Sequence, residues 1–395
     1  MSRRSNFISV RLKYTQAPMA TCSAKNLTLS LILLFSLPAF SSYQSPSGCF
    51  ESIISFGDSL ADTGNRLRLV GSNVSSLACS RLPYGETFFH HPTGRYSNGR
   101  LVVDFIAESL GLPLVEPYVG GLNAIFGKGV NFAVAGATAL DNEYLEKMGI
   151  YPETNASLGI QMDWFKQFLA SLEDGKRFVQ NSLILLGEIG GNDYNVPLMI
   201  KMGMNPETLR SLAPAVVNYI GITLQELIKL GARRVLVPGN FPIGCFPVFL
   251  TAYMSDEENY RDPETGCINW LNELSRYHNE LLQKELNRIQ KLYPRTSIIY
   301  VDYYNALLKI YLSPEEYGFG KKSLLNACCG GRGAFSYNDS AFCGSPLSAS
   351  CEDPSLYVSW DGLHLTEAAY RFLAQGLFGG HYTTMCSSTS RVARF

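Results

Sequence analysis

Two segments that lie far apart in the sequence carry the residue types needed for nucleophilic catalysis. Ser59 follows a short apolar run within residues 53–65, in a small polar turn that contains glycine. Asp361 and His364 stand three residues apart within residues 360–370, immediately before a predicted helix. At a helical turn this spacing puts both side chains on one face, so the carboxylate can bind one imidazole nitrogen while the other faces a serine. Such an arrangement would activate the serine hydroxyl for attack on a carbonyl carbon.

Each of these segments also has a simpler interpretation. A Gly-Asp-Ser triplet, here Gly57 to Ser59, is common and taken alone is more typical of a structural turn. The Asp361–His364 pair fits a capped loop with an incidental histidine equally well. Thr366 and Ala369 do not complete a capping box, so the start of the predicted helix depends on propensity alone.

Two further segments offer hydrogen-bond donors for a developing negative charge. Asn192 lies in residues 186–194, after an apolar run, and its side-chain amide could bind an oxyanion. Gly136 lies in residues 129–138 and offers a backbone N–H for the same purpose. The 129–138 segment lacks the Lys and Ser/Thr ending of a phosphate-binding loop. The chain also lacks a Gly-x-Ser-x-Gly elbow, which argues against the α/β-hydrolase fold.

Short apolar runs rich in β-branched residues predict the strands that position these segments. They recur with long, partly helical stretches between them, at residues 52–56, 182–186, 234–237 and 297–301. This alternation is typical of a parallel sheet covered by helices on both faces. Ser59 and Asn192 then follow the carboxyl ends of strands, which is the edge where open α/β sheets bind ligands.

Two helices are clear from the apolar spacing. Residues 101–110 form the first, which ends before Gly111 and Pro113. Residues 269–292 form the second, with Leu and Ile at three- and four-residue intervals and charged residues between them. His278 lies on this second helix without a pattern that suggests a partner, and we interpret it as a core residue.

The first 41 residues predict a secretory signal. They contain five basic residues and no acidic ones, and their apolar centre, residues 27–37, would span roughly 17 Å as a helix. That length is short of a hydrocarbon core of about 30 Å, so we expect no integral membrane anchor. Small residues at Ala39 and Ser41 predict cleavage near Ser41. A plastid or mitochondrial transit peptide is the alternative, and Met19 is an alternative start.

Composition excludes several classes of protein. The chain has 395 residues, 46% of them hydrophobic and 17% charged, and its 33 Lys and Arg nearly balance 34 Asp and Glu. These values exclude a disordered chain, and the lack of a basic excess argues against nucleic-acid binding. Loss of the five basic residues would change the net charge from -1 to -1 - 5 = -6. Without repeats or a long linker, we expect one domain over residues 49–380 and a tail over residues 381–395.

Cysteines and sequons favour an oxidising compartment. Ten cysteines less Cys22 leave nine in the mature chain, and four of these cluster between residues 328 and 351. The cluster lacks paired Cys-x-x-Cys spacing and a nearby His, so we favour disulfides over a zinc site. Cys245 and Cys267 are a plausible local pair, although sequence does not fix the connectivity and nine thiols leave one unpaired. Sequons at Asn73, Asn155 and Asn338 predict glycan sites.

Together the four segments, in this order, resemble the GDSL esterase/lipase family, also called the SGNH hydrolases. The resemblance covers residues 49–378 and is closest to the plant branch that includes sinapine esterase and acetylajmalan esterase. The run at residues 83–100 is similar to that branch. The resemblance implies a three-layer α/β/α, flavodoxin-like fold with a central parallel sheet, and it implies no metal and no organic cofactor. The sequence departs from the family after Gly376, where the tail is longer than usual.

The resemblance also assigns the site. It implies Ser59 as the nucleophile, His364 as the general base and Asp361 as the residue that orients the histidine. The oxyanion hole would comprise the Ser59 backbone, Gly136 and Asn192. We read His90 and His91 as loop residues near the mouth of the site and His381 as part of an exposed tail.

The expected function is that of a serine carboxylesterase, secreted or carried to the vacuole by the same pathway. It would act on small-molecule esters of specialised metabolites or short acyl chains. The alternatives are a lipase or acyltransferase for long-chain lipid esters and, in another class, a non-catalytic ligand-binding protein on the same fold. Because a protonated imidazole is no base, activity should fall between about pH 8 and pH 5. Sequence leaves the acyl and alcohol specificity and the oligomeric state open.

Overall fold

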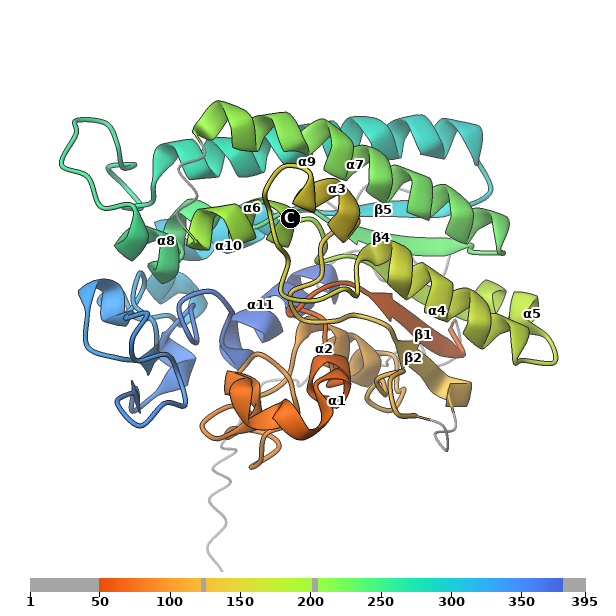
Figure 1. Cartoon of the computed structure of the whole chain (residues 1–395), viewed down its shortest axis with the longest axis horizontal. Coiled ribbons are helices and arrows are strands. Elements are labelled where there is room, and N and C mark those ends of the chain that lie inside the picture. Colours follow the sequence, from red (N-terminus) through yellow and green to blue (C-terminus); the bar gives the residue numbers. More distant parts are fainter. Residues whose placement is uncertain (1–49, 122–125, 201–204, 379–395) are drawn as a thin grey trace, which may run out of the picture. The chain divides into compact units, whose positions relative to one another are not determined.

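A five-stranded sheet, all parallel and ordered β2-β1-β3-β4-β5, lies at the centre of the fold (Figure 1). The computed structural model describes residues 50–121, 126–200 and 205–378. The strands are β1 (Ser52–Phe56), β2 (Gly129–Asn131), β3 (Ser182–Leu186), β4 (Arg234–Pro238) and β5 (Ser297–Val301). Every residue of β1 and β3 is buried, as expected for strands that have helices on both faces.

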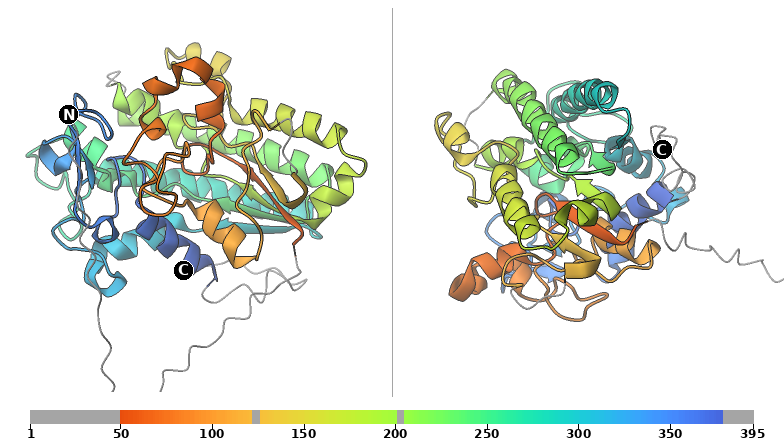
Figure 2. Two further views of the ribbon diagram at one scale, coloured as in Figure 1. Left: turned by 90° about the horizontal axis from the view of Figure 1, so that it is seen from below. Right: turned by 90° about the vertical axis from the view of Figure 1, so that its right-hand side faces the viewer.

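Helices cover both faces of this sheet (Figure 2). On one face lie α4 (Leu158–Ala170), α7 (Pro206–Lys229) and α9 (Asn269–Leu292), with α7 packed along α9. On the other face lie α2 (Val102–Ser109), α10 (Tyr303–Leu312) and α11 (Glu367–Phe378), with α11 packed against both α2 and α10. The predicted three-layer α/β/α fold is therefore confirmed.

Shorter elements complete the described chain. The short helices are α1 (Asn65–Leu69), α3 (Asn142–Glu146), α5 (Gly175–Asn181), α6 (Asn192–Met199) and α8 (Pro247–Ala252). A separate antiparallel pair joins β6 (Cys329–Gly330) to β7 (Ala349–Ser350).

The predicted elements agree closely with the structure. Four predicted strands are present, and β4 extends one residue further, to Pro238. The helix predicted at residues 269–292 is α9, whose apolar positions face the core, and the one predicted at residues 101–110 is α2. Sequence patterns missed β2, because three residues are too few for a periodic signal.

The order of the strands creates the crevice in which the site lies. From β1 the chain moves outward to β2, then returns to β3 on the other side of β1 and continues to β4 and β5. The loops that follow β1 and β3 therefore diverge at their carboxyl ends. This reversal is the point at which doubly wound sheets bind ligands.

Disulfides join residues of the described chain at three places. They link Cys245 to Cys267, Cys328 to Cys351 and Cys329 to Cys343. The predicted Cys245–Cys267 pair and the disulfide interpretation of the 328–351 cluster are confirmed. Cys79 is buried and free, whereas Cys22, Cys49 and Cys386 lie outside the described residues.

Two features of the long helices bear on the sequence analysis: the surroundings of His278 in α9 and the composition of α7. His278 of α9 is buried and has a partner, since its Nδ1 lies 2.9 Å from the Tyr194 hydroxyl oxygen. In the described ranges one helix, α7, has the length and apolar composition of a membrane span. Half of its most apolar stretch is buried against the rest of the protein, as in the core helix of a globular fold.

Candidate active site

Three loops at the carboxyl edge of the sheet bring the predicted site residues toward one another. Ser59 lies in the turn after β1, Gly136 in the loop after β2, and Asn192 at the start of α6 after β3. Asp361 and His364 come from a bend just before α11. The sheet order thus makes neighbours of segments that are far apart in the sequence.

Ser59, His364 and Asp361 form a continuous chain of hydrogen bonds. Nε2 of His364 lies 2.8 Å from Oγ of Ser59, and Nδ1 of the same ring lies 2.7 Å from Oδ2 of Asp361. Ser59 is 8% exposed and His364 is 7% exposed, so bulk water is largely excluded while the hydroxyl group remains within reach. This geometry can pass the serine proton to the imidazole as the oxygen attacks.

The Asp361 carboxylate accepts four hydrogen bonds. Oδ1 accepts from the backbone N–H groups of Leu363 at 3.1 Å and His364 at 2.8 Å. Oδ2 accepts from the His364 ring and, at 2.8 Å, from the hydroxyl group of Tyr84. Burial alone raises the pKa of this carboxyl group, but the charge and hydrogen bonds of His364, with the Tyr84 hydroxyl, lower it to about 2. Asp361 is therefore ionised at neutral pH.

The local geometry of this pair differs from the helical turn predicted from its spacing. Residues 361–364 form a bend, and α11 begins only at Glu367. Oδ1 of Asp361 binds the backbone N–H groups of Leu363 and His364. These bonds curve the chain so that the His364 ring reaches Oδ2 of the same carboxylate. The helix start is also better defined than predicted, since Oγ1 of Thr366 accepts the backbone N–H of Ala369.

The three groups predicted for an oxyanion hole retain donors for a ligand. Within the described residues, the backbone N–H groups of Ser59 and Gly136 have no acceptor. The side-chain nitrogen of Asn192 donates one hydrogen to the carbonyl of Ala137 at 2.9 Å, which leaves its second hydrogen free. Gly136 has φ +82°, a left-handed conformation that glycine adopts without strain.

Asp62 and Asn65 join the turn after β1 to the loop after β2, a role that sequence reasoning missed. The Asp62 carboxylate accepts backbone N–H groups from its own turn and, at 2.8 Å, from Ala135. Nδ2 of Asn65 donates to the carbonyls of Asn131 and Ala133, both at 2.8 Å. The available signal was an Asp followed by Thr-Gly-Asn, which is typical of side chains that bind nearby backbone.

Asp193 plays the corresponding role between the loops after β2 and β3. Its carboxylate accepts the backbone N–H groups of Ala139 at 2.8 Å and Leu140 at 3.0 Å. Burial raises the pKa of this group to about 7, against the lowering effect of those hydrogen bonds. Asp193 thereby fixes the loop whose Ala137 carbonyl binds Asn192.

A narrow pocket opens beside Ser59 and His364. Its walls combine apolar side chains from Leu60, Ile189, Phe241, Ile243, Phe246 and Leu363 with polar ones from Asp58, Glu188, Asn192, Asn195 and Asn240. It leaves about 40 Å³ for the centres of water-sized molecules, which is room for a small group. Burial raises the pKa of Glu188 to about 8 and that of Asp58 well above its ordinary value. Both carboxyl groups are therefore poorly solvated.

The remaining predicted residues take no part in this chain of hydrogen bonds. His90 and His91 are exposed, and each ring binds a backbone carbonyl near it in sequence, while His381 lies outside the described residues. Asn73 and Asn155 are exposed and Asn338 is half-buried. In the part of the chain that the structure describes, no group of three or more His, Cys, Asp or Glu is placed to hold a metal ion.

Comparison with known proteins identifies relatives over most of the chain. The family model for GDSL-like lipase/acylhydrolase matches residues 53–377. The Arabidopsis thaliana protein GDSL esterase/lipase At1g28580 is 52% identical over 339 residues, which cover 84% of this chain and 86% of the relative. A second, GDSL esterase/lipase At1g28570, is 50% identical over 372 residues, which cover 92% of this chain and 94% of the relative.

Proposed function

Since the chain belongs to the GDSL-like lipase/acylhydrolase family and is a carboxylic ester hydrolase, we propose that it acts through a Ser59–His364–Asp361 triad. Its substrates are esters of small metabolites or of short acyl chains. The observation that carries this proposal is the unbroken chain of short hydrogen bonds from Ser59 through His364 to Asp361.

The reaction begins with attack of Oγ of Ser59 on the ester carbonyl. Nε2 of His364, 2.8 Å from this oxygen, takes its proton, and the ionised Asp361 stabilises the imidazolium that forms. His364 then protonates the departing alcohol, which leaves an acyl group on Ser59. Water, deprotonated by the same imidazole, hydrolyses this acyl-enzyme and restores the serine.

Three donors stabilise the negative charge on the tetrahedral intermediate. They are the free backbone N–H groups of Ser59 and Gly136 and the second side-chain hydrogen of Asn192. Because Asp62 and Asp193 fix the loops that carry Gly136 and hold Asn192, these donors need little reorganisation as the charge develops.

The size of the pocket supports a short acyl group or a compact alcohol as substrate. Only about 40 Å³ beside Ser59 is open to the centres of water-sized molecules, which suits a small group better than a long acyl chain. Apolar Phe241, Ile243 and Phe246 would bind the hydrocarbon part of such a group. A lipase or acyltransferase acting on long-chain esters would require this pocket to widen.

Secretion is part of the proposal. Residues 1–41 would be removed as a signal, residues 49–380 would form the hydrolase domain, and residues 381–395 would follow it as a tail. Three disulfides in the described chain support an oxidising compartment, and the exposure of Asn73 and Asn155 suits glycans. N-terminal sequencing of protein recovered from plant culture medium, with glycosidase treatment, tests this. An intact Met1 and no change in mass would contradict it.

Hydrolysis of p-nitrophenyl acetate and butyrate tests the chemistry. Wild-type protein should release p-nitrophenol and should be labelled by a fluorophosphonate at Ser59, whereas the Ser59→Ala variant should do neither. Equal hydrolysis by both proteins would refute the triad, and failure of the wild type to label or hydrolyse would indicate a ligand-binding protein. A clear preference for emulsified long-chain esters over soluble short ones would indicate a lipase.

A further inference from the structure

The 83–100 segment has no part in the proposed mechanism, yet it lies directly against Asp361 and His364. The hydroxyl group of Tyr84 donates to Oδ2 of Asp361 at 2.8 Å. The ring of Tyr96 lies 4.7 Å from the His364 ring, measured between centroids. Tyr84 is 2% exposed and contacts the rings of both Tyr96 and Trp360 edge to face. Packing on several sides therefore fixes the position of its hydroxyl group.

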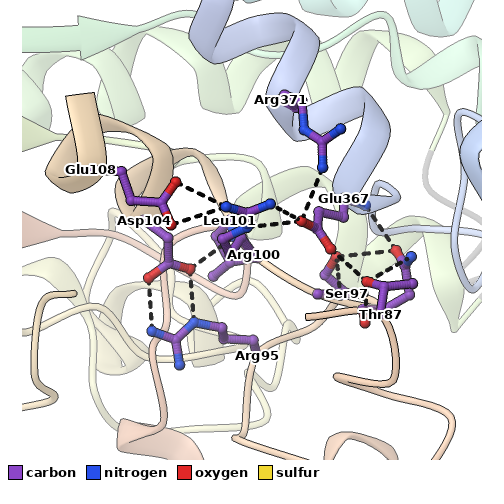
Figure 3. Close-up of polar contacts among 11 residues, drawn as sticks. Thr87, Arg95, Ser97, Arg100, Leu101, Asp104, Glu108, Glu367 and Arg371 are labelled. Atoms are coloured by element: carbon purple, nitrogen blue, oxygen red, sulfur yellow. Dashed lines mark hydrogen bonds and ion pairs between the residues drawn. The ribbon is translucent and has the colours of Figure 1, made fainter. Parts of the chain in front are cut away.

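Ion pairs and hydrogen bonds fasten the far end of this segment to α2 and α11 (Figure 3). Arg95 binds Asp104 through two hydrogen bonds, and Arg100 binds both Glu108 and Glu367. The hydroxyl group of Thr87 and the side chain of Asn98 also bind Glu367, the first residue of α11. α11 begins shortly after the Asp361–His364 bend. The bonds to Glu367 therefore fix the position of the 83–100 segment relative to that bend.

We propose that Tyr84 is a positioning residue of the esterase reaction: its hydroxyl group holds the Asp361 carboxylate oriented toward Nδ1 of His364. The proposal rests on the triad put forward above. Tyr84 acts through Asp361 and does not touch the reacting atoms.

Oδ2 of Asp361 is shared between two donors at nearly equal distances, 2.7 Å from the His364 ring and 2.8 Å from the Tyr84 hydroxyl. Burial, and then the charge of Asp361, raise the pKa of Tyr84 well above its ordinary value. The phenol therefore remains a donor throughout the working range of the enzyme. It disperses part of the carboxylate charge and prevents rotation of the carboxylate away from the ring.

Loss of this hydroxyl group has two separate consequences. The carboxylate becomes less firmly oriented, so His364 is held less well for proton transfer and kcat falls. The undispersed charge on Oδ2 also attracts the imidazolium more strongly, which stabilises the inactive, protonated form of the site. The acid-side midpoint of the pH profile should therefore move upward, which a purely structural defect would not cause.

Other titratable groups lie near the pair, and all of them are retained in both variants. Those that interact with Asp361 or His364 are Asp58, Cys79, Tyr96, Tyr337 and Tyr370. Burial raises the pKa of the Cys79 thiol to about 12 and raises those of the tyrosines, so these groups are neutral. Asp58 is the one carboxyl group among them. Asp58 is present in the wild type and in both variants, so its titration does not cause a difference between their pH profiles.

The test compares Tyr84→Phe with Tyr311→Phe, a matched control. Tyr311 is buried on α10, and its hydroxyl group has no hydrogen-bond partner among the described residues. Each variant thus loses one buried hydroxyl, but only the first loses a bond to Asp361. We would measure kcat and KM for p-nitrophenyl butyrate from about pH 5 to pH 9. Rates would be divided by the number of sites that a fluorophosphonate labels.

For Tyr84→Phe we expect unchanged KM, a fall in kcat of about tenfold and a rise of about 0.5 to 1 unit in the acid-side midpoint. Tyr311→Phe should match the wild type. A wild-type kcat and midpoint for Tyr84→Phe, once rates are corrected for labelled sites, would overturn the proposal. Hydrolysis by Ser59→Ala at the wild-type rate would instead overturn the triad itself.

A second substitution tests the same bond in the opposite direction and does not depend on the folding of Tyr84→Phe. Site-specific 3-fluorotyrosine at position 84 retains the ring and hydroxyl but makes the phenol a stronger donor. The acid-side midpoint should then move below that of the wild type. An unchanged or higher midpoint would contradict the proposed role.

Discussion

The buried ion pair between Arg95 and Asp104 should be one of the strongest local determinants of stability in the described chain. The Arg95 side chain is 7% exposed and that of Asp104 is fully buried, and two hydrogen bonds of 2.8 Å join them. Asp104 also accepts the backbone N–H of Leu101 at 2.9 Å, and Arg95 donates to the Thr63 carbonyl at 3.3 Å. Removal of one partner leaves the other charge buried without compensation.

The expected cost follows from this geometry. Asp104→Asn retains an oxygen for Leu101 but removes the charge, and Arg95→Met removes the cation; each should lower the free energy of unfolding by about 3 to 5 kcal/mol. The double variant Arg95→Met/Asp104→Asn removes both charges and retains an oxygen for the Leu101 N–H, at about 1 to 3 kcal/mol. The double variant should therefore be more stable than the sum of the single losses predicts.

Urea denaturation followed by tryptophan fluorescence, with disulfides intact, measures these differences. Lys147→Met is the control, because the Lys147–Glu143 pair has the same kind of chemistry on the surface, with side chains 72% and 83% exposed. It should leave the midpoint unchanged. The reasoning would be refuted if the loss of stability in the double variant equalled the sum of the two single losses. It would also be refuted if each single variant were as stable as the Lys147→Met control.

Three further predictions concern the site and its supports. Asp361→Asn should lower kcat by roughly 10³- to 10⁴-fold without unfolding the protein, because an amide favours the wrong tautomer of the histidine; a change below tenfold in ester hydrolysis would contradict this. Gly57→Ala should lower the free energy of unfolding by at least about 2 kcal/mol, because Gly57 has φ +147° and a Cβ there would lie 2.3 Å from the Gly187 carbonyl oxygen. Gly111→Ala, with open space around the added Cβ, should lower it less in the same urea assay. Burial lowers the pKa of His278 from 6.5 to about 4. Between these two pH values the unfolded chain binds a proton at His278 that the folded chain excludes. The free energy of unfolding of the wild type should therefore fall by up to roughly 3 kcal/mol as pH falls from 6.5 to 4. His278→Gln should lack that loss; equal slopes of stability against pH for the two proteins would count against it.

Local patterns predicted those elements whose signal lies in a few neighbouring residues. The helix over residues 269–292 has the same bounds in the structure as in the prediction, because its apolar spacing is regular over 24 residues. The buried strands β1, β3 and β5 were equally clear. By contrast β2 has only three residues and depends on pairing with β1, and the bend at residues 361–364 depends on side-chain bonds to its own backbone that no apolar pattern records. The spacing indicated that the two side chains could meet, and they do so through this bend just before α11 and not through a helical turn.

Sequence by itself determined the class of chemistry, since the residue types in four short segments, in their order, indicate an ester hydrolase of this family. It also determined most of the sheet, whose buried strands carry their own hydrophobic signal. Only the tertiary structure decided how those segments meet. The reversal of strand order beside β1 places Ser59 against His364, and the 83–100 segment places Tyr84 against Asp361. The physical reason is that a hydrogen bond between residues hundreds of positions apart depends on the packing of everything between them, which no local pattern records.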